Sequence, residues 1–203
     1  MVAALCVLLV AVLGHAHHAL ATDIAVGGCH DKEVVQNFDV QRYSGLWYEI
    51  SRYWQFFELN GKCVTAEYTF NATSGRVGVK NSMVDATSLQ AKSIEGFAEL
   101  ADPSASPAVG KLTVTFKIPV VGDQRAPYWV LDTDYVNYAV VYSCNNIFFG
   151  ALRVESAWVL SRTPHVTDPA VQRAIEAAIA KADLKPSSLL KTEQDCPPST
   201  TAQ

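Results

Sequence analysis

The sequence has few histidines and none of the short motifs that most often mark an enzyme. It contains no Gly-x-Ser-x-Gly, His-Glu-x-x-His or Cys-x-x-Cys pattern and no glycine-rich phosphate loop. Histidine is scarce, and His15, His17 and His18 lie in a stretch expected to be cleaved off. The other two, His30 and His165, fall in an N-terminal arm and a proline-containing turn, where surface positions are expected. We therefore expect no catalytic site and no metal site.

Charged side chains are absent from the first 21 residues. An apolar run from Val2 to Leu13 precedes the small-x-small sequence Ala19-Leu20-Ala21, which is typical of a signal-peptide cleavage site. The run is shorter than the ~20 residues that cross a bilayer. Residues 1–21 are thus predicted to be a secretory signal peptide, and the protein to be extracellular.

The rest of the chain, residues 22–203, lacks basic runs and suits a single domain. The net charge of −4 argues against a nucleic-acid partner. Four cysteines remain after the leader, which predicts two disulfides with three pairings open.

Most of this domain alternates apolar and polar residues with period two, as half-buried strands do. Val64, Ala66 and Tyr68, for example, alternate with Thr65 and Glu67. Eight such stretches with turns between them favour an all-β fold, an up-and-down antiparallel barrel or a sandwich. The expected strands are 45–54, 62–70, 77–84, 93–100, 111–116, 128–132, 137–144 and 152–160.

One segment has helical spacing instead. Asp168 can cap a helix over about 168–183, Pro169 suits its first turn, and Pro186 prevents its extension. Its apolar stripe predicts packing on the outside of the sheet. The tail after residue 196 is expected to be disordered.

Several motifs lie far apart in the chain but form a recognisable set. They include Asn37-Phe38-Asp39, Gly45-Leu46-Trp47-Tyr48-Glu49, Thr133-Asp134-Tyr135 and Trp158-Val159-Leu160-Ser161-Arg162. With them, the chain from about Cys29 to Cys196 resembles the lipocalin family, in the branch of apolipoprotein D and the insecticyanin-like bilin-binding proteins. The resemblance implies an eight-stranded antiparallel up-and-down barrel over about 45–162 with one C-terminal helix packed outside.

The resemblance also assigns roles. It implies the disulfides Cys29–Cys144 and Cys63–Cys196. Barrel closure brings Trp47 and Arg162 to one end, where a guanidinium over an indole is stabilising. Together the residues expected to plug this end are Gly45, Trp47, Thr133, Asp134, Tyr135 and Arg162.

A second set is expected to bind a ligand inside the barrel. Period-two alternation directs Tyr68, Leu112, Val114, Phe116, Leu152, Val154 and Trp158 inward, where they either line a cavity or simply pack the core. The resemblance implies ligand contacts at Tyr68, Asn81, Tyr128 and Trp158. Asp85 occupies a position where apolipoprotein D carries an arginine; it either accepts hydrogen bonds from pyrrole N–H groups or points into solvent.

These residues predict a protein that binds and transports or sequesters a small hydrophobic ligand. No cofactor is required, and a biliverdin-type tetrapyrrole is the favoured ligand because Asp85 disfavours fatty-acid head groups. A retinoid, sterol or fatty acid is the alternative. From another class, a lipid isomerase is disfavoured by the even cysteine count, and an antioxidant lipocalin enzyme would have only Met83 to oxidise.

Apolar loops are expected at the open end. Trp54, Phe56, Phe57 and Leu59 lie in one, and Ile147, Phe148 and Phe149 in another. We expect a folded-in lid, with a contact surface for a membrane, lipoprotein or second copy as the alternative. Asn71-Ala72-Thr73 is a glycosylation sequon in a predicted turn.

Overall fold

A computed structural model describes residues 23–55 and 58–196 of the chain. The predicted signal peptide, residues 1–21, and the tail from residue 197 lie outside the described residues. Across the described ranges, none of the helices has the length and apolarity needed to cross a bilayer.

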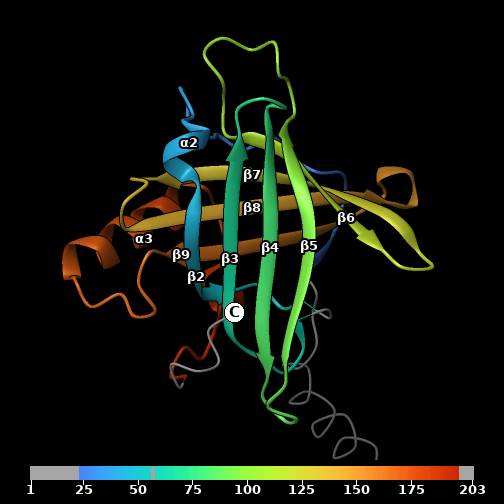
Figure 1. The fold of residues 1–203 in the computed structure, drawn as a ribbon. Helices are drawn as coiled ribbons and strands as arrows, with labels where there is room; N and C mark the ends of the chain where they lie inside the picture. Colours follow the sequence, from blue (N-terminus) through green and yellow to red (C-terminus); the bar gives the residue numbers. More distant parts are fainter. Residues whose placement is uncertain (1–22, 56–57, 197–203) are drawn as a thin grey trace, which may run out of the picture.

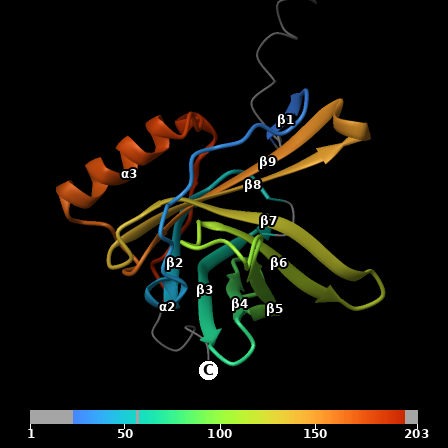
Figure 2. The ribbon, with the colours of Figure 1, turned by 90° about the horizontal axis from the view of Figure 1, so that it is seen from above.

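Eight antiparallel strands, β2 to β9, form a closed barrel (Figure 1, Figure 2). Each strand pairs with the next, and β9 pairs back with β2, so the sheet closes on itself and is not a sandwich. The predicted barrel is confirmed. The strands are β2 Gly45–Arg52, β3 Gly61–Asn71, β4 Arg76–Asp85, β5 Ala91–Leu100, β6 Lys111–Ile118, β7 Gly122–Thr133, β8 Tyr138–Ile147 and β9 Leu152–Ser161.

The sequence pattern missed several short elements. Strand β1 (Asp23–Val26) pairs with β9, and β10 (Leu190–Lys191) pairs with β2. A single helical turn, α2 (Val40–Tyr43), crosses one end of the barrel, and two 3-10 turns, η3 (Phe148–Gly150) and η4 (Pro186–Ser188), occur later in the chain. Strand β7 also begins at Gly122, before the predicted start at 128, because the polar stretch there continues the pairing with β6.

The predicted helix is present as α3 (Pro169–Lys181), packed outside the barrel (Figure 2). The Asp168 side chain accepts a hydrogen bond from the Ala170 N–H and caps it. Its buried residues Ile175, Ala178 and Ile179 pack in an outer core with side chains from β7, β8 and β9. A separate inner core, which includes Trp47 and Tyr68, lies within the barrel.

Trp47 and Arg162 plug the end of the barrel next to α2. The Trp47 side chain is fully buried, and its indole N–H donates to the Tyr43 carbonyl at 2.8 Å. The Arg162 guanidinium lies 3.6 Å from the centroid of the indole ring. It also donates hydrogen bonds to carbonyl oxygens from α2, from the start of β2 and from the β7–β8 turn, namely those of Arg42, Tyr43, Ser44, Leu46 and Tyr135.

The other residues predicted for this end lie around that pair. Gly45 has a φ of +99°, and a Cβ there would also meet the Arg162 guanidinium at 3.3 Å. The Thr133 hydroxyl donates to the Tyr138 carbonyl, and Asp134 accepts from three backbone N–H groups that come after it in the chain. Burial opposes ionisation of Asp134, but a hydrogen bond from the Asn137 side chain and these backbone hydrogen bonds together lower its pKa below the usual value. The structure thus brings all six predicted residues to one end.

Both disulfides implied by the resemblance are formed. Cys29–Cys144 ties the N-terminal arm to β8, and Cys63–Cys196 ties the C-terminal segment to β3. The second bond is supported by Gln194, whose side chain donates to the carbonyls of Glu49 and Val64.

We predict that Arg162→Ala lowers the free energy of unfolding by about 2–4 kcal/mol, because it removes the cation–π contact and five hydrogen bonds, three of them partly buried. The affinity for a fluorescent hydrophobic probe should be unchanged, since Arg162 does not line the barrel cavity. Thermal and denaturant unfolding measure the first effect, with Arg173→Ala on the exposed face of α3 as the control. Loss of probe affinity in a variant of parental stability would contradict this role.

Candidate ligand-binding site

The barrel encloses a cavity of about 740 Å³. Its wall is mainly apolar, and the side chains come from all eight barrel strands, from α2 and from neighbouring loop residues. The inward residues therefore leave a hollow within the size range of small-molecule sites. Apolar members of the wall are Phe38, Val40, Val64, Ala66, Val77, Val79, Ile94, Ala98, Leu112, Val114, Phe116, Ile118, Ala126 and Leu160.

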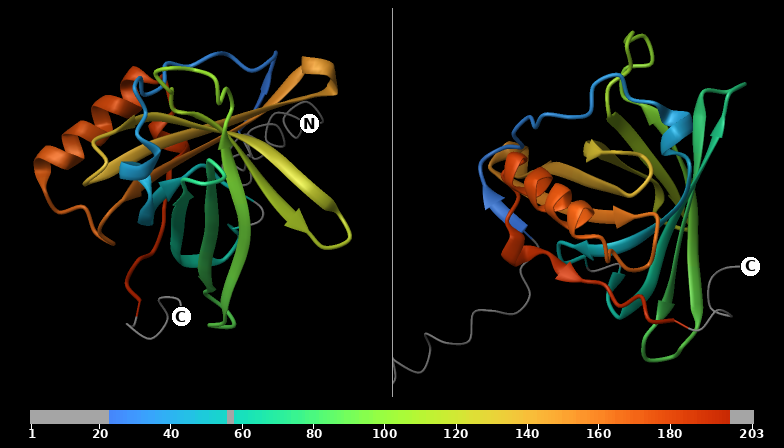
Figure 3. Two further views of the ribbon diagram at one scale, coloured as in Figure 1. Left: turned by 45° about the horizontal axis from the view of Figure 1, so that its top comes forward. Right: turned by 90° about the vertical axis from the view of Figure 1, so that its left-hand side faces the viewer.

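Six of the seven predicted ligand-binding residues line this cavity: Tyr68, Asn81, Val114, Phe116, Tyr128 and Trp158. Of the other residues expected to face inward, Leu112 lines it, but Leu152 and Val154 do not. These two lie where β9 extends past the barrel to pair with β1 (Figure 3).

Three tyrosine hydroxyls join at the cavity wall near the plugged end. The Tyr128 hydroxyl lies 2.8 Å from that of Tyr43 and 2.8 Å from that of Tyr68. Burial raises the pKa of all three phenols, that of Tyr68 to about 12, so they stay protonated. Three O–H protons share two hydroxyl–hydroxyl contacts, so at least one O–H is left to donate elsewhere.

Asp85 does not belong to the cavity wall. Its carboxylate accepts hydrogen bonds from the backbone N–H groups of Thr87 and Ser88 in the β4–β5 turn and pairs with Lys92 at 2.7 Å. Lys92 and these N–H donors hold the pKa of Asp85 well below its usual range. The predicted place of Asp85 in the cavity wall is therefore wrong: the residue ends β4, and its carboxylate is taken up by the β4–β5 turn and Lys92.

The place of Asp85 changes the charge expected on the cavity wall. Lys92, the partner of Asp85, itself lines the cavity, and so does Arg125. Cationic groups therefore do occur on the cavity wall, and the inferred bias against carboxylate ligands loses its basis.

The structure also shows a charged cluster in the wall that the sequence pattern missed. Arg52 donates to Glu49 Oε1 at 2.8 Å and lies 2.7 Å from Glu58 Oε2, and both glutamates line the cavity. Glu49 and Arg52 are three residues apart, which would place them on opposite faces of a regular strand. A register shift between Glu49 and Ser51 brings them to the same side. The one sequence signal for this cluster is that Glu49 lies two residues after Trp47, so that strand alternation directs both side chains into the barrel.

Burial dominates the ionisation of the cluster. It raises the pKa of Glu58 from the usual 4.5 to about 8, and the nearby charge of Glu49 adds to the shift. It also raises the pKa of Glu49, against the opposing effects of Arg52 and Thr192. One guanidinium thus faces two carboxyl groups, of which Glu58 is mainly protonated at neutral pH.

The predicted aromatic lid is wrong for two of its members. Phe148 and Phe149 are exposed at the tip of the β8–β9 hairpin and do not line the cavity. Both have positive φ values, 49° and 56°, which turn the chain sharply there. Leu59 is also exposed and Trp54 is half-buried, whereas Phe56 and Phe57 lie outside the described residues.

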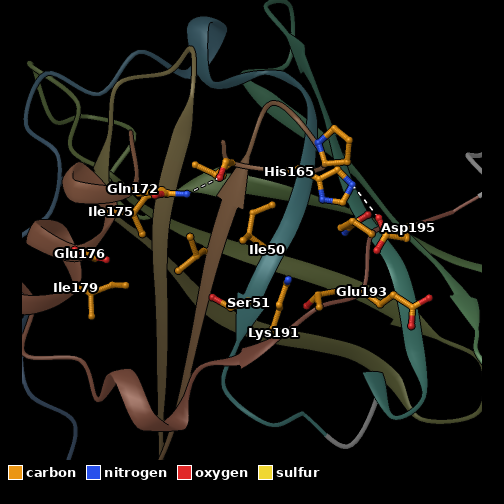
Figure 4. A pocket seen from close by; sticks show the side chains of 15 residues that line it. Ile50, Ser51, His165, Gln172, Ile175, Glu176, Ile179, Lys191, Glu193 and Asp195 are labelled. Atoms are coloured by element: carbon orange, nitrogen blue, oxygen red, sulfur yellow. Dashed lines mark hydrogen bonds and ion pairs between the residues drawn. The ribbon is translucent and has the colours of Figure 1, made fainter. Parts of the chain in front are cut away.

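A second concavity, of about 620 Å³, lies outside the barrel between α3, β2 and the C-terminal segment (Figure 4). It contains His165, whose Nε2 lies 3.2 Å from Asp195 at the surface. His30 is exposed, and no cluster of metal-ligating side chains occurs within the described residues. Asn71 is exposed at the end of β3, next to the β3–β4 turn, and glycosylation there stays a prediction.

A closed barrel with one plugged end and an apolar cavity defines a binding protein for a small hydrophobic ligand. Residues 38–194 match the family model of a lipocalin-like domain, and the chain belongs to the lipocalin family.

The chain is similar to proteins known from insects and from a mammal. It is 36% identical over 169 residues to the Lazarillo protein of Schistocerca americana, covering 82% of this chain and 75% of that one. It is 38% identical over 143 residues to apolipoprotein D of Mus musculus, covering 70% and 69%. The solved structure of insecticyanin from Manduca sexta superposes with a TM-score of 0.76 at 27% identity, covering 89% and 92%.

We predict that the stability of the protein falls as pH rises from about 4.5 to about 8. Part of this fall comes from Glu58, which keeps its proton in the folded state and releases it on unfolding. In this range an unfolded glutamate is ionised while the folded Glu58 is still protonated, so unfolding releases a proton and becomes more favourable as the pH rises. Glu58→Gln cannot titrate, and its melting temperature should fall less over the same range. Calorimetry of parent and variant at both ends of the range measures this difference, and parallel profiles would refute the assignment.

Proposed function

We propose that the cavity carries a bilin-type tetrapyrrole and that the protein transports or sequesters this pigment outside the cell. The cavity is the observation that carries the proposal: it is large, mostly apolar, and has a few polar groups with defined positions. A linear tetrapyrrole has an apolar conjugated body, N–H donors and carboxylates. The cavity offers an apolar wall, the acceptor groups of Glu58 and Asn81, and the cations Lys92 and Arg125.

A fatty acid is the second candidate, because Lys92 and Arg125 can each pair with a carboxylate. Retinoids and sterols would use the apolar wall and the tyrosine hydroxyls. For any of these ligands, affinity comes mainly from apolar burial at roughly 25 cal/mol per Å², less the cost of association.

We propose a binding role without catalysis. The four cysteines within the described chain form two disulfides, so none of them supplies the thiolate that a lipid isomerase would need. An antioxidant enzyme would depend on Met83, which lines the cavity. Secretion is supported by the leader-like residues 1–21 and by the two disulfides, which form in oxidising compartments.

The protein purified from its source should show long-wavelength absorption bands that co-elute with it in gel filtration. Added biliverdin should give the same bands with the recombinant protein. The variant Ala98→Trp tests whether the pigment lies in the cavity. It places a large side chain in the cavity wall and should abolish the bands without unfolding the barrel. A colourless protein that does not take up biliverdin but yields fatty acids on extraction would replace the bilin with the second candidate.

We also propose that the open-end hairpin contacts a lipid surface. Exposed apolar side chains occur at the tips of three loops at this end, as Leu89, Val120, Val121, Phe148 and Phe149. Single exposed apolar residues are common, but several at one end of a barrel favour an interface.

The parent should therefore float with phosphatidylcholine liposomes, and the double variant Phe148→Ser, Phe149→Ser should float several-fold less, since it removes two large apolar contacts. Val136→Ser, at the plugged end, is the control because it removes an exposed apolar side chain far from the hairpin. Absence of the parent from the liposome fraction would end this proposal and leave the cavity's role untouched.

A further inference from the structure

The cluster of Glu49, Arg52 and Glu58 has an unbalanced set of charges for a buried site. In the part of the chain that the structure describes, the ion pairs of both glutamates are made by the one guanidinium of Arg52. A buried ionised carboxylate is costly without a partner of its own. The cluster is therefore neutral only when one carboxyl keeps its proton or when a further cation or donor joins it.

The two glutamates differ in how fully their neighbours engage them. Glu49 is almost completely buried and accepts hydrogen bonds from Arg52 and from the Thr192 hydroxyl. Glu58 is held by the Arg52 guanidinium, and Trp158 is the register partner of Arg52 on the adjoining strand β9. Glu49 and the Trp158 side chain both lie close enough to affect the pKa of Glu58. Because Glu58 and Trp158 both line the cavity, Glu58 is the carboxyl that a ligand beside Trp158 can meet.

Two further polar features of the cavity wall are incompletely satisfied. The Asn81 side-chain oxygen is buried and accepts no hydrogen bond from the described residues. The hydroxyls of Tyr43, Tyr68 and Tyr128 have three O–H donors but form two hydrogen bonds with one another, so one O–H is left without an acceptor among them. The side chains of Tyr43 and Tyr68 are more than nine-tenths buried. Unsatisfied polar groups in a roomy cavity indicate that a polar ligand or water completes them.

We propose that Glu58 is the specificity-determining group of the cavity and accepts a hydrogen bond from an N–H or ammonium donor on the ligand. The cavity then selects apolar molecules that carry a nitrogen donor over neutral alcohols of the same length. This inference rests on the proposed carrier function and narrows it to a class of ligand.

The two kinds of donor differ in what they do to the proton on Glu58. An ammonium group pairs with the ionised carboxylate, so the Glu58 proton passes to the buffer as the cation binds. A neutral pyrrole-type N–H donates to an oxygen of the carboxyl group, and no proton leaves. A cationic ligand should therefore bind with proton release, and a neutral one without it.

The test compares dodecylamine with dodecanol, two probes with the same alkyl chain, by isothermal titration calorimetry at neutral pH. The parent should bind the amine roughly 10- to 100-fold more tightly, the range expected for one hydrogen bond between charged groups. Glu58→Gln should remove most of this preference and leave the affinity for dodecanol unchanged. Glu67→Gln, on the exposed face of β3, is the matched control and should keep the preference.

A second measurement needs no variant. Titrations of the parent with dodecylamine in two buffers of different ionisation enthalpy report the number of protons released, which should approach one for the amine and zero for dodecanol. Equal affinity for both probes in the parent, or a preference that survives Glu58→Gln, would overturn the role of Glu58 while leaving the carrier function standing. If the parent bound neither of the two probes and also failed to bind biliverdin and fatty acid, the carrier function itself would be overturned.

Discussion

Pairing of β2 with β9 is the contact on which the rest of the structure depends. It turns a row of strands into a closed wall, so that the inner apolar faces meet a cavity and not solvent. The same seam aligns the start of β2 with the end of β9, which brings Arg162 over Trp47 at the plugged end. The irregularity within the seam then places Glu49 and Arg52 together on one side of the wall. Closure, the plug and the charged cluster are thus three results of one strand pairing.

The interior has polar groups of different character along its length. Phenol hydroxyls that remain protonated lie toward the plug, the carboxyl pair lies in the wall beside Trp158, and the cationic side chains Lys92 and Arg125 complete the set. An apolar ligand of any shape could fill the volume, but only an elongated one with its own pattern of donors and acceptors could satisfy these groups together. The arrangement of polar atoms therefore restricts the ligand more than the cavity volume does.

Regular alternation in the sequence was enough to predict a large part of the wall and the helix. The inward positions of Tyr68, Val114, Phe116 and Trp158 and the helical stripe of α3 all required only a fixed period. Barrel closure alone predicted that Trp47 and Arg162 meet, whereas the rest of the plug and both disulfides came from resemblance, since no local pattern states which distant residues meet. Errors arose where the chain leaves its period: the shift after Glu49, the turn that draws Asp85 to Lys92, and the left-handed residues that turn Phe148 outward. Strands as short as β1 and β10 carry too few residues for any period to show.

The segment after η4 runs along the outside of the barrel, yet its side chains form hydrogen bonds with groups of the barrel wall. Thr192 reaches Glu49, Gln194 holds two carbonyls of the wall, and Cys196 anchors the segment to β3. Without it, Glu49 would lose a donor and gain access to solvent, and the ionisation of its neighbour Glu58 would change with it. A recombinant fragment that stops after α3 would keep the eight barrel strands, but its cavity would differ in charge and therefore in ligand preference.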